Sequence, residues 1–116
     1  MKIKLIKKDE GISRKISNSY EVKNLVTKDT SNKISLAISN AKEHSEITKN
    51  KRSDRIYYIL KGRLIVKEKD NELIADKGDA IFIPANTNYI FKGTFKAILI
   101  NSPTFNPNDE KIQSSK

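Results

Sequence analysis

Apolar and polar side chains alternate along most of this sequence with a period of two, the pattern of β-strands that bury one face. Turn residues, among them Gly62, Gly78 and Gly93, separate these stretches at short intervals. Short strands at such spacing are typical of an all-β barrel or sandwich, and no stretch has the period of a helix. The predicted strands are residues 2–7, 20–26, 33–39, 56–60, 64–66, 72–75, 80–83, 89–91 and 95–100.

Three segments lack this alternation. Residues 12–19 are polar and are predicted to be a loop. Residues 40–54 are almost without apolar side chains, which indicates a functional rim loop with part of its length in a strand. Regular structure is expected to end after Pro103 and Pro107, and the polar tail after them to be frayed. The alternation also predicts a set of largely buried aliphatic residues: Ile56, Ile59, Leu64, Ile81, Ile83, Ile98 and Ile100.

Length and composition limit the classes of protein. The 116 residues are enough for one domain with an apolar core, and the absence of cysteine leaves no disulfide framework. No apolar run is long enough to cross a bilayer, so no membrane partner is expected. The charged N-terminus lacks the apolar segment of a secretory signal, so we expect a cytoplasmic protein.

The formal net charge of +9 raises the question of nucleic-acid binding. The lysines are scattered along the chain, however, and only four arginines are present. Because arginine is the preferred residue for bidentate phosphate and base contacts, nucleic acid is the least favoured partner.

Two stretches resemble the paired motifs of the cupin family of jelly-roll β-barrels. The first is Arg55, followed by IYYILK and Gly62, which keeps the x6 spacing at the end of the first cupin motif. The second is Gly78, followed by DAIFI and Pro84, which keeps the x5 spacing of the second motif. The resemblance covers about residues 34–103. It implies a single domain over residues 1–116, folded as an antiparallel jelly-roll barrel with an additional N-terminal strand.

In cupins these motifs hold a divalent metal through three histidines and a glutamate, and this chain departs from that pattern at every ligand position. The glutamate position is Arg55, and the histidine of the second motif is Tyr89. The paired histidine positions fall on one of two pairs, according to the gap: Lys49 and Lys51, or Thr48 and Asn50. Protonated Lys and Arg cannot coordinate a divalent cation and repel it. We therefore expect no metal and no cofactor at the usual cupin site.

His44 and Glu46 offer an alternative, because alternate residues of a strand share a face and could be relocated metal ligands. Metal sites need three or four protein ligands, and His44 is the only histidine in the chain. The favoured interpretation is a solvent-facing loop histidine beside two carboxylates.

Cationic residues at ligand positions predict a basic cavity that binds a small anion, such as a carboxylate, a sugar phosphate or a nucleotide sugar. Arg55 is the expected anchor, partnered by the ligand or by a protein carboxylate such as Glu72. Two alternatives remain: a cupin-type sugar isomerase or epimerase, and a metal-dependent cupin enzyme with relocated ligands. Catalytic residues are not identified. The predicted ligand-binding residues are Arg55, Tyr89, Lys51, Lys49 and Tyr57.

A homodimer is also expected. Residues 1–7 or 20–26 would pair with a partner, because an uncovered edge strand is prone to aggregation.

Overall fold

The computed structural model describes residues 3–114, which form an antiparallel β-structure without an α-helix. Two short 3₁₀ turns, η1 (Lys8–Glu10) and η2 (Pro107–Asp109), precede the first and the last strand. Within these residues there is no helix of the length and apolarity needed to span a membrane. The strands are β1 (Ile12–Ser17), β2 (Tyr20–Val26), β3 (Ser35–Asn50), β4 (Asp54–Glu68), β5 (Asn71–Asp76), β6 (Ala80–Ile83), β7 (Tyr89–Ser102) and β8 (Glu110–Ser114).

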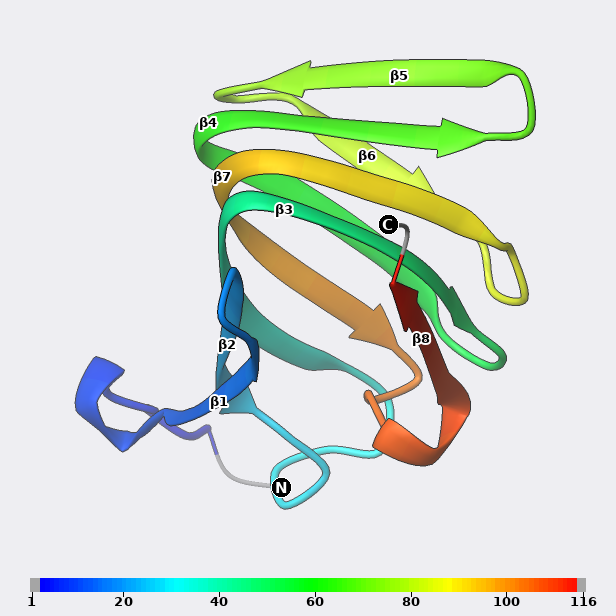
Figure 1. Ribbon diagram of the computed structural model, residues 1–116. Coiled ribbons are helices and arrows are strands. Elements are labelled where there is room, and N and C mark those ends of the chain that lie inside the picture. The colour runs from blue at the N-terminus through cyan, green and yellow to red at the C-terminus, as the bar shows by residue number, and fades with distance from the viewer. Residues whose placement is uncertain (1–2, 115–116) are drawn as a thin grey trace.

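The strands belong to one sheet in the order β1-β2-β3-β7-β4-β5, with β6 paired to β4 and β8 paired to β3. Figure 1 shows the long strands β3, β4 and β7 bending sharply, so that the sheet folds back on itself around an interior. Every pairing is antiparallel. The prediction of an all-β antiparallel barrel is confirmed.

Irregularities in β3 and β4 change which side chains face the interior. In β3 the register shifts between Ala41 and His44, where Glu43 has a positive φ of 47°. Odd-numbered residues of β3 are buried before this bulge, and even-numbered residues are buried after it. The register of β4 shifts in the same way between Ile59 and Lys61. A bulge adds one residue to one strand, so it inverts the alternation beyond it.

Four of the seven predicted core residues, Ile59, Leu64, Ile81 and Ile83, are buried. For the other three, the prediction of burial is corrected. Odd-numbered residues of β7 and of the first half of β4 face the interior, so their even-numbered neighbours lie on the outer face. Ile56 is accordingly 37% exposed, and Ile98 and Ile100 are half-buried.

Both ends of the chain differ from the sequence-based prediction. Residues 3–7 have no regular structure, and Ile3 and Leu5 are exposed because no strand lies beside them. Met1 and Lys2, which belong to the predicted first strand, lie outside the described residues. The first strand is instead β1, within a segment predicted to be a loop. The C-terminal segment is not frayed, because β8 pairs with the second half of β3.

The prediction of a rim loop at residues 40–54 is also corrected. Strand β3 continues to Asn50, and only residues 51–53 connect it to β4. The polar residues that resembled a loop therefore line the interior of the barrel in the second half of β3.

Candidate functional site

Strand β3 supplies a row of polar side chains to the interior. The bulge at Glu43 turns every second residue after it inward, and these residues are all less than 9% exposed: His44, Glu46, Thr48 and Asn50. An alternation of polar inward with mixed outward residues is visible in the sequence, but it resembles a loop because it has no apolar face. The structure therefore adds His44 and Glu46 to the predicted site.

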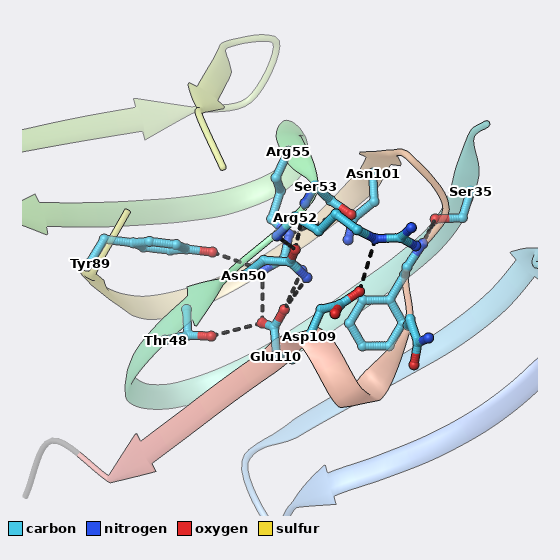
Figure 2. Close-up of polar contacts among 12 residues, drawn as sticks. Ser35, Thr48, Asn50, Arg52, Ser53, Arg55, Tyr89, Asn101, Asp109 and Glu110 are labelled. Atoms are coloured by element: carbon cyan, nitrogen blue, oxygen red, sulfur yellow. Dashed lines mark hydrogen bonds and ion pairs between the residues drawn. The ribbon is translucent and has the colours of Figure 1, made fainter. Parts of the chain in front are cut away.

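Arg55, at the start of β4, is the centre of a buried hydrogen-bond cluster (Figure 2). Its Nη1 and Nη2 donate to the two carboxylate oxygens of Glu110 at 2.9 and 2.8 Å. Nη1 also donates to the Tyr89 hydroxyl at 3.0 Å, and Nε donates to Oδ1 of Asn101 at 3.0 Å. The Arg55 side chain is only 4% exposed. It is thus paired within the chain, in the bidentate geometry that suits arginine and carboxylate.

The predicted carboxylate partner, Glu72, is wrong. Glu72 lies on the exposed β4–β5 hairpin, 3.9 Å from Lys67, while Glu110 reaches the interior from β8. The Glu110 carboxylate also accepts hydrogen bonds from Thr48 Oγ1 at 2.7 Å and from Asn50 Nδ2 at 2.8 Å. Burial alone would raise the pKa of Glu110. The hydrogen bonds and the positive charge of the guanidinium outweigh burial and bring that pKa below its ordinary value.

Two tyrosines adjoin this cluster. The hydroxyls of Tyr57 and Tyr89 share a hydrogen bond of 2.8 Å, and both side chains are buried. Burial raises the pKa of each phenol. The pair therefore stays protonated and can donate hydrogen bonds. The structure brings together three of the predicted ligand-binding residues, namely Arg55, Tyr57 and Tyr89.

The two predicted lysines are not part of this assembly. Lys49 lies on the outer side of β3 and is half-buried, and Lys51 is exposed in the turn that follows. The inward positions are Thr48 and Asn50, the other pair compatible with the motif spacing. Because side chains alternate along a strand, a register error of one residue moved the prediction to the wrong face.

His44 and Glu46 form a second buried pair. His44 Nε2 lies 2.8 Å from Glu46 Oε1, and His44 Nδ1 lies 2.6 Å from the Ser19 hydroxyl. The Tyr20 ring stacks on the imidazole at 4.8 Å and an angle of 9°. Burial raises the pKa of Glu46, and the hydrogen bond and charge of His44 only partly oppose this. The interpretation of His44 as a solvent-facing loop residue is therefore wrong.

A cavity of about 50 Å³ lies between the Arg55–Glu110 pair and the His44–Glu46 pair. The rings of Tyr20, Tyr57 and Phe91 line it, and His44 lies behind Tyr20. Two charged side chains of each sign face the cavity: Arg14, Arg55, Glu46 and Glu110. The prediction of a basic cavity is therefore corrected, because two carboxyl groups accompany the two guanidinium groups that line it.

The residues at the usual cupin ligand positions do not fit a metal ion. Arg55 and Asn50 Nδ2 present hydrogen-bond donors to the place where a cation would need acceptors. In residues 3–114 no group of three or more His, Cys, Asp or Glu side chains is arranged to hold one.

The family model for the ethanolamine utilisation protein EutQ matches residues 2–104. The chain belongs to this family. A comparison with curated proteins found no match.

Solved cupin-fold structures resemble most of this EutQ-family chain. A tyrosine-to-phenylalanine variant of Streptomyces PAC13 with uridine has a TM-score of 0.83 at 20% identity, over 98% of this chain and 93% of that one. KdgF from Halomonas sp. has a TM-score of 0.76 at 16% identity, over 88% and 96% of the two chains. The Clostridium difficile EutQ protein has a TM-score of 0.69 at 23% identity, over 73% and 63%. At these identities the likeness establishes the cupin-like β-barrel, and the resemblance to cupins is confirmed.

Proposed function

We propose that this EutQ-family chain binds a nucleoside or a similar sugar-bearing molecule in its barrel and removes water from it without a metal. The observation that carries the proposal is the buried Glu46 carboxyl, which faces a cavity lined by aromatic rings, among them Tyr57, whose hydroxyl is hydrogen-bonded to that of Tyr89. A small-molecule site with aromatic walls and a few polar groups is the usual form of a ligand pocket.

Likeness to PAC13 supports the choice of substrate class. That protein is described as a nucleoside dehydratase, and its structures with uridine include variants that replace a histidine or either of two tyrosines. One histidine and two tyrosines of the present chain, His44, Tyr57 and Tyr89, stand at or behind the cavity wall. The shared residue types, together with a fold shared over nearly the full length, support related chemistry.

Glu46 is the proposed general base. Its raised pKa makes it a better proton acceptor than an exposed carboxylate, and a general base works best with a pKa near the working pH. His44 holds the carboxyl in place through the 2.8 Å contact, and Ser19 fixes the imidazole in turn. His44 and Ser19 are therefore positioning residues, and Glu46 is the group that meets the substrate.

Elimination of water breaks one C–H and one C–O bond and forms a C=C bond. Glu46 takes the proton from carbon, and the hydroxyl on the neighbouring carbon leaves with a proton donated by the Tyr57–Tyr89 pair. Arg55 donates to Tyr89, which favours the negative charge that develops on the phenol oxygens. The proton held by Glu46 returns to the tyrosine pair through solvent, which restores the enzyme.

Uridine titration, followed by NMR shifts of the full chain, tests binding. We expect saturable shifts that are weakened in Tyr57→Phe and unchanged in Tyr58→Phe, a matched control whose ring is 41% exposed on the outer face. Mass spectrometry of incubated nucleosides should detect a product lacking one water with the wild type and none with Glu46→Gln. Failure of uridine and other nucleosides to bind, or equal binding by the two tyrosine variants, would contradict the proposal.

Binding without catalysis is the second candidate function. The observation that favours it is Arg55, a buried cation suited to a small anion. Saturable ligand binding with no product from any nucleoside tested would favour this function over dehydration.

A further inference from the structure

The donors that surround the Glu110 carboxylate are held in place by the barrel itself. Asn101 and Tyr89 fix the guanidinium of Arg55 through Nε and Nη1. The amide of Asn50 is oriented by its Oδ1, which accepts hydrogen bonds from the backbone N–H groups of residues 52 and 53. Thr48 belongs to the continuous strand β3. The donor set would therefore keep its shape if Glu110 were withdrawn.

Glu110 is carried by a peripheral segment, residues 105–114, which we call the C-terminal strap. The strap follows the last residue of the family match, and Figure 1 shows β8 lying along the outer part of β3. Strand β8 pairs only with Glu46–Asn50 among the described residues, and its side chains at positions 111–113 are exposed. Three outer contacts also attach the strap: an ion pair of 3.1 Å between Arg52 and Asp109, a hydrogen bond of 3.0 Å from the Lys51 N–H to the Asp109 carbonyl, and one of 2.9 Å from the Phe105 N–H to Ser35 Oγ. A segment that buries so little apolar surface is expected to open locally.

An entrance to the donor set already exists beside the strap. An open hollow of about 330 Å³ lies between β1 and the strap, and it shares Arg14, Phe105 and Glu110 with the inner cavity. The guanidinium of Arg14 lies over the Phe105 ring at 5.4 Å, across this boundary. Movement of the strap would join the hollow to the cavity.

One donor in the cavity wall has no partner when the strap is closed. Asn101 is 1% exposed and lines the cavity, and its Nδ2 is the single buried side-chain polar atom in residues 3–114 without a hydrogen bond. A buried unpaired donor is costly, so it favours a ligand that brings an acceptor oxygen.

We propose that Arg55, Thr48, Asn50 and Asn101 form a carboxylate-binding site, which Glu110 occupies when the strap is closed and a ligand carboxylate occupies when it opens. The planar, bidentate contact with Glu110 shows that the site accepts a carboxylate. The site shares Arg55 with the proposed dehydratase, but Glu46 and His44 are not part of it, and acetate binding is measured without any turnover. Loss of the proposed dehydratase activity would therefore leave it standing, and loss of carboxylate binding would leave the dehydratase proposal standing.

Acetate is the probe. The full chain is titrated with sodium acetate against sodium chloride of equal ionic strength, and both the melting temperature and the NMR signal of Arg55 Nε–H are followed. Glu110→Ala should bind acetate saturably and at least tenfold more tightly than the wild type, in which Glu110 competes. Asp76→Ala is the matched control, because it frees Arg63 from an exposed ion pair and should respond like the wild type.

A second variant tests the opening of the strap if Glu110→Ala fails to fold. Arg52→Gln removes one outer attachment and leaves the side chains of the donor set unchanged, so the open fraction rises and acetate should bind about two- to fivefold more tightly. Absence of a saturable response in Glu110→Ala, or an equal response in Asp76→Ala, would overturn the site. Unchanged acetate affinity in Arg52→Gln would overturn the opening, and inorganic phosphate binding more tightly than acetate would overturn the carboxylate assignment.

Discussion

Two glutamates in the same barrel, Glu110 and Glu46, illustrate how partners decide the role of a buried carboxyl. Both side chains are less than a tenth exposed, but the pKa of Glu110 is lowered and that of Glu46 is raised. Glu110 accepts hydrogen bonds from a guanidinium, a hydroxyl and an amide. Glu46 has an imidazole as its ionisable partner and faces an aromatic wall. Burial is common to both, so the number and charge of the donors account for the difference.

This difference in pKa distinguishes a carboxylate that stabilises the fold from a carboxyl that can take part in proton transfer. The Arg55–Glu110 pair holds its charges over the ordinary pH range and ties the C-terminal strap to β4. Burial raises the pKa of Glu46, which makes its carboxyl a better proton acceptor than an exposed one and suits acid–base chemistry. The comparison can be tested by removing one member of each pair.

Arg55→Met should have the largest effect on stability. It leaves the Glu110 carboxylate almost buried without its cation, which should lower the free energy of unfolding by about 3–5 kcal/mol. Urea unfolding measures this loss. The control is Arg63→Met, which removes an exposed arginine from its pair with Asp76 and should cost about 0–1 kcal/mol. Similar losses in the two variants would contradict the structural role of Arg55.

The sequence predicted this cluster only in part. The motif spacing placed Arg55 and Tyr89 on one site because each lies at the regular start of its strand, and the register shift of β4 comes only after Ile59. Glu110 was missed because its face of β8 carries only one apolar side chain among the described residues, Ile112, which is too few to indicate a strand by alternation.

His44 and Glu46 were considered as a pair on one strand face, but the favoured interpretation placed His44 in an exposed loop, for a different physical reason. The bulge that turns their side chains inward occurs at Glu43. Glutamate rarely takes a positive φ, so the residue type gave no indication that the side chains beyond it switch to the interior face. The strands themselves were found more easily, because apolar alternation reports burial on one side directly. Where the buried face is polar, alternation persists but resembles a loop.

Glu110→Gln should destabilise the protein by about 1–3 kcal/mol near neutral pH, because a neutral amide replaces a charged acceptor of several hydrogen bonds. Since the folded pKa of Glu110 lies below its ordinary value of 4.5, its stabilisation is present above that value. The stabilisation is lost as the pH falls through the folded pKa. Unfolding curves of the variant and the wild type should therefore converge as the pH falls below about 4.5. A difference that stays constant with pH would show that Glu110 is not held as the charged form.

Glu46→Gln should give the opposite sign. The folded pKa of Glu46 is raised above 4.5, so the protonated form stabilises the fold at low pH and the benefit is lost as the pH rises through the folded pKa. The neutral variant should thus match the wild type in acid and exceed it near neutral pH, by on the order of 1 kcal/mol. Thermal unfolding over a pH series checks this. Loss of stability in the variant at neutral pH would contradict the assignment of a raised pKa.

Ser19→Ala should have an effect on stability as small as that of Glu46→Gln, and it tests how His44 is held beside Glu46. Ser19 reaches Glu46 only through His44, since its hydroxyl lies 2.6 Å from Nδ1 while Nε2 faces the carboxyl. Without the hydroxyl the ring loses one of two restraints, which should cost about 0.5–1.5 kcal/mol. The nitrogen shifts of the imidazole in NMR spectra should change at the same time. Ser17→Ala is the control, because Ser17 contacts the Ser19 hydroxyl at 3.3 Å but not the ring. If both serine variants left the imidazole shifts unchanged, Ser19 would be a turn residue only, and the orientation of His44 would rest on Glu46 and the stacked Tyr20 ring.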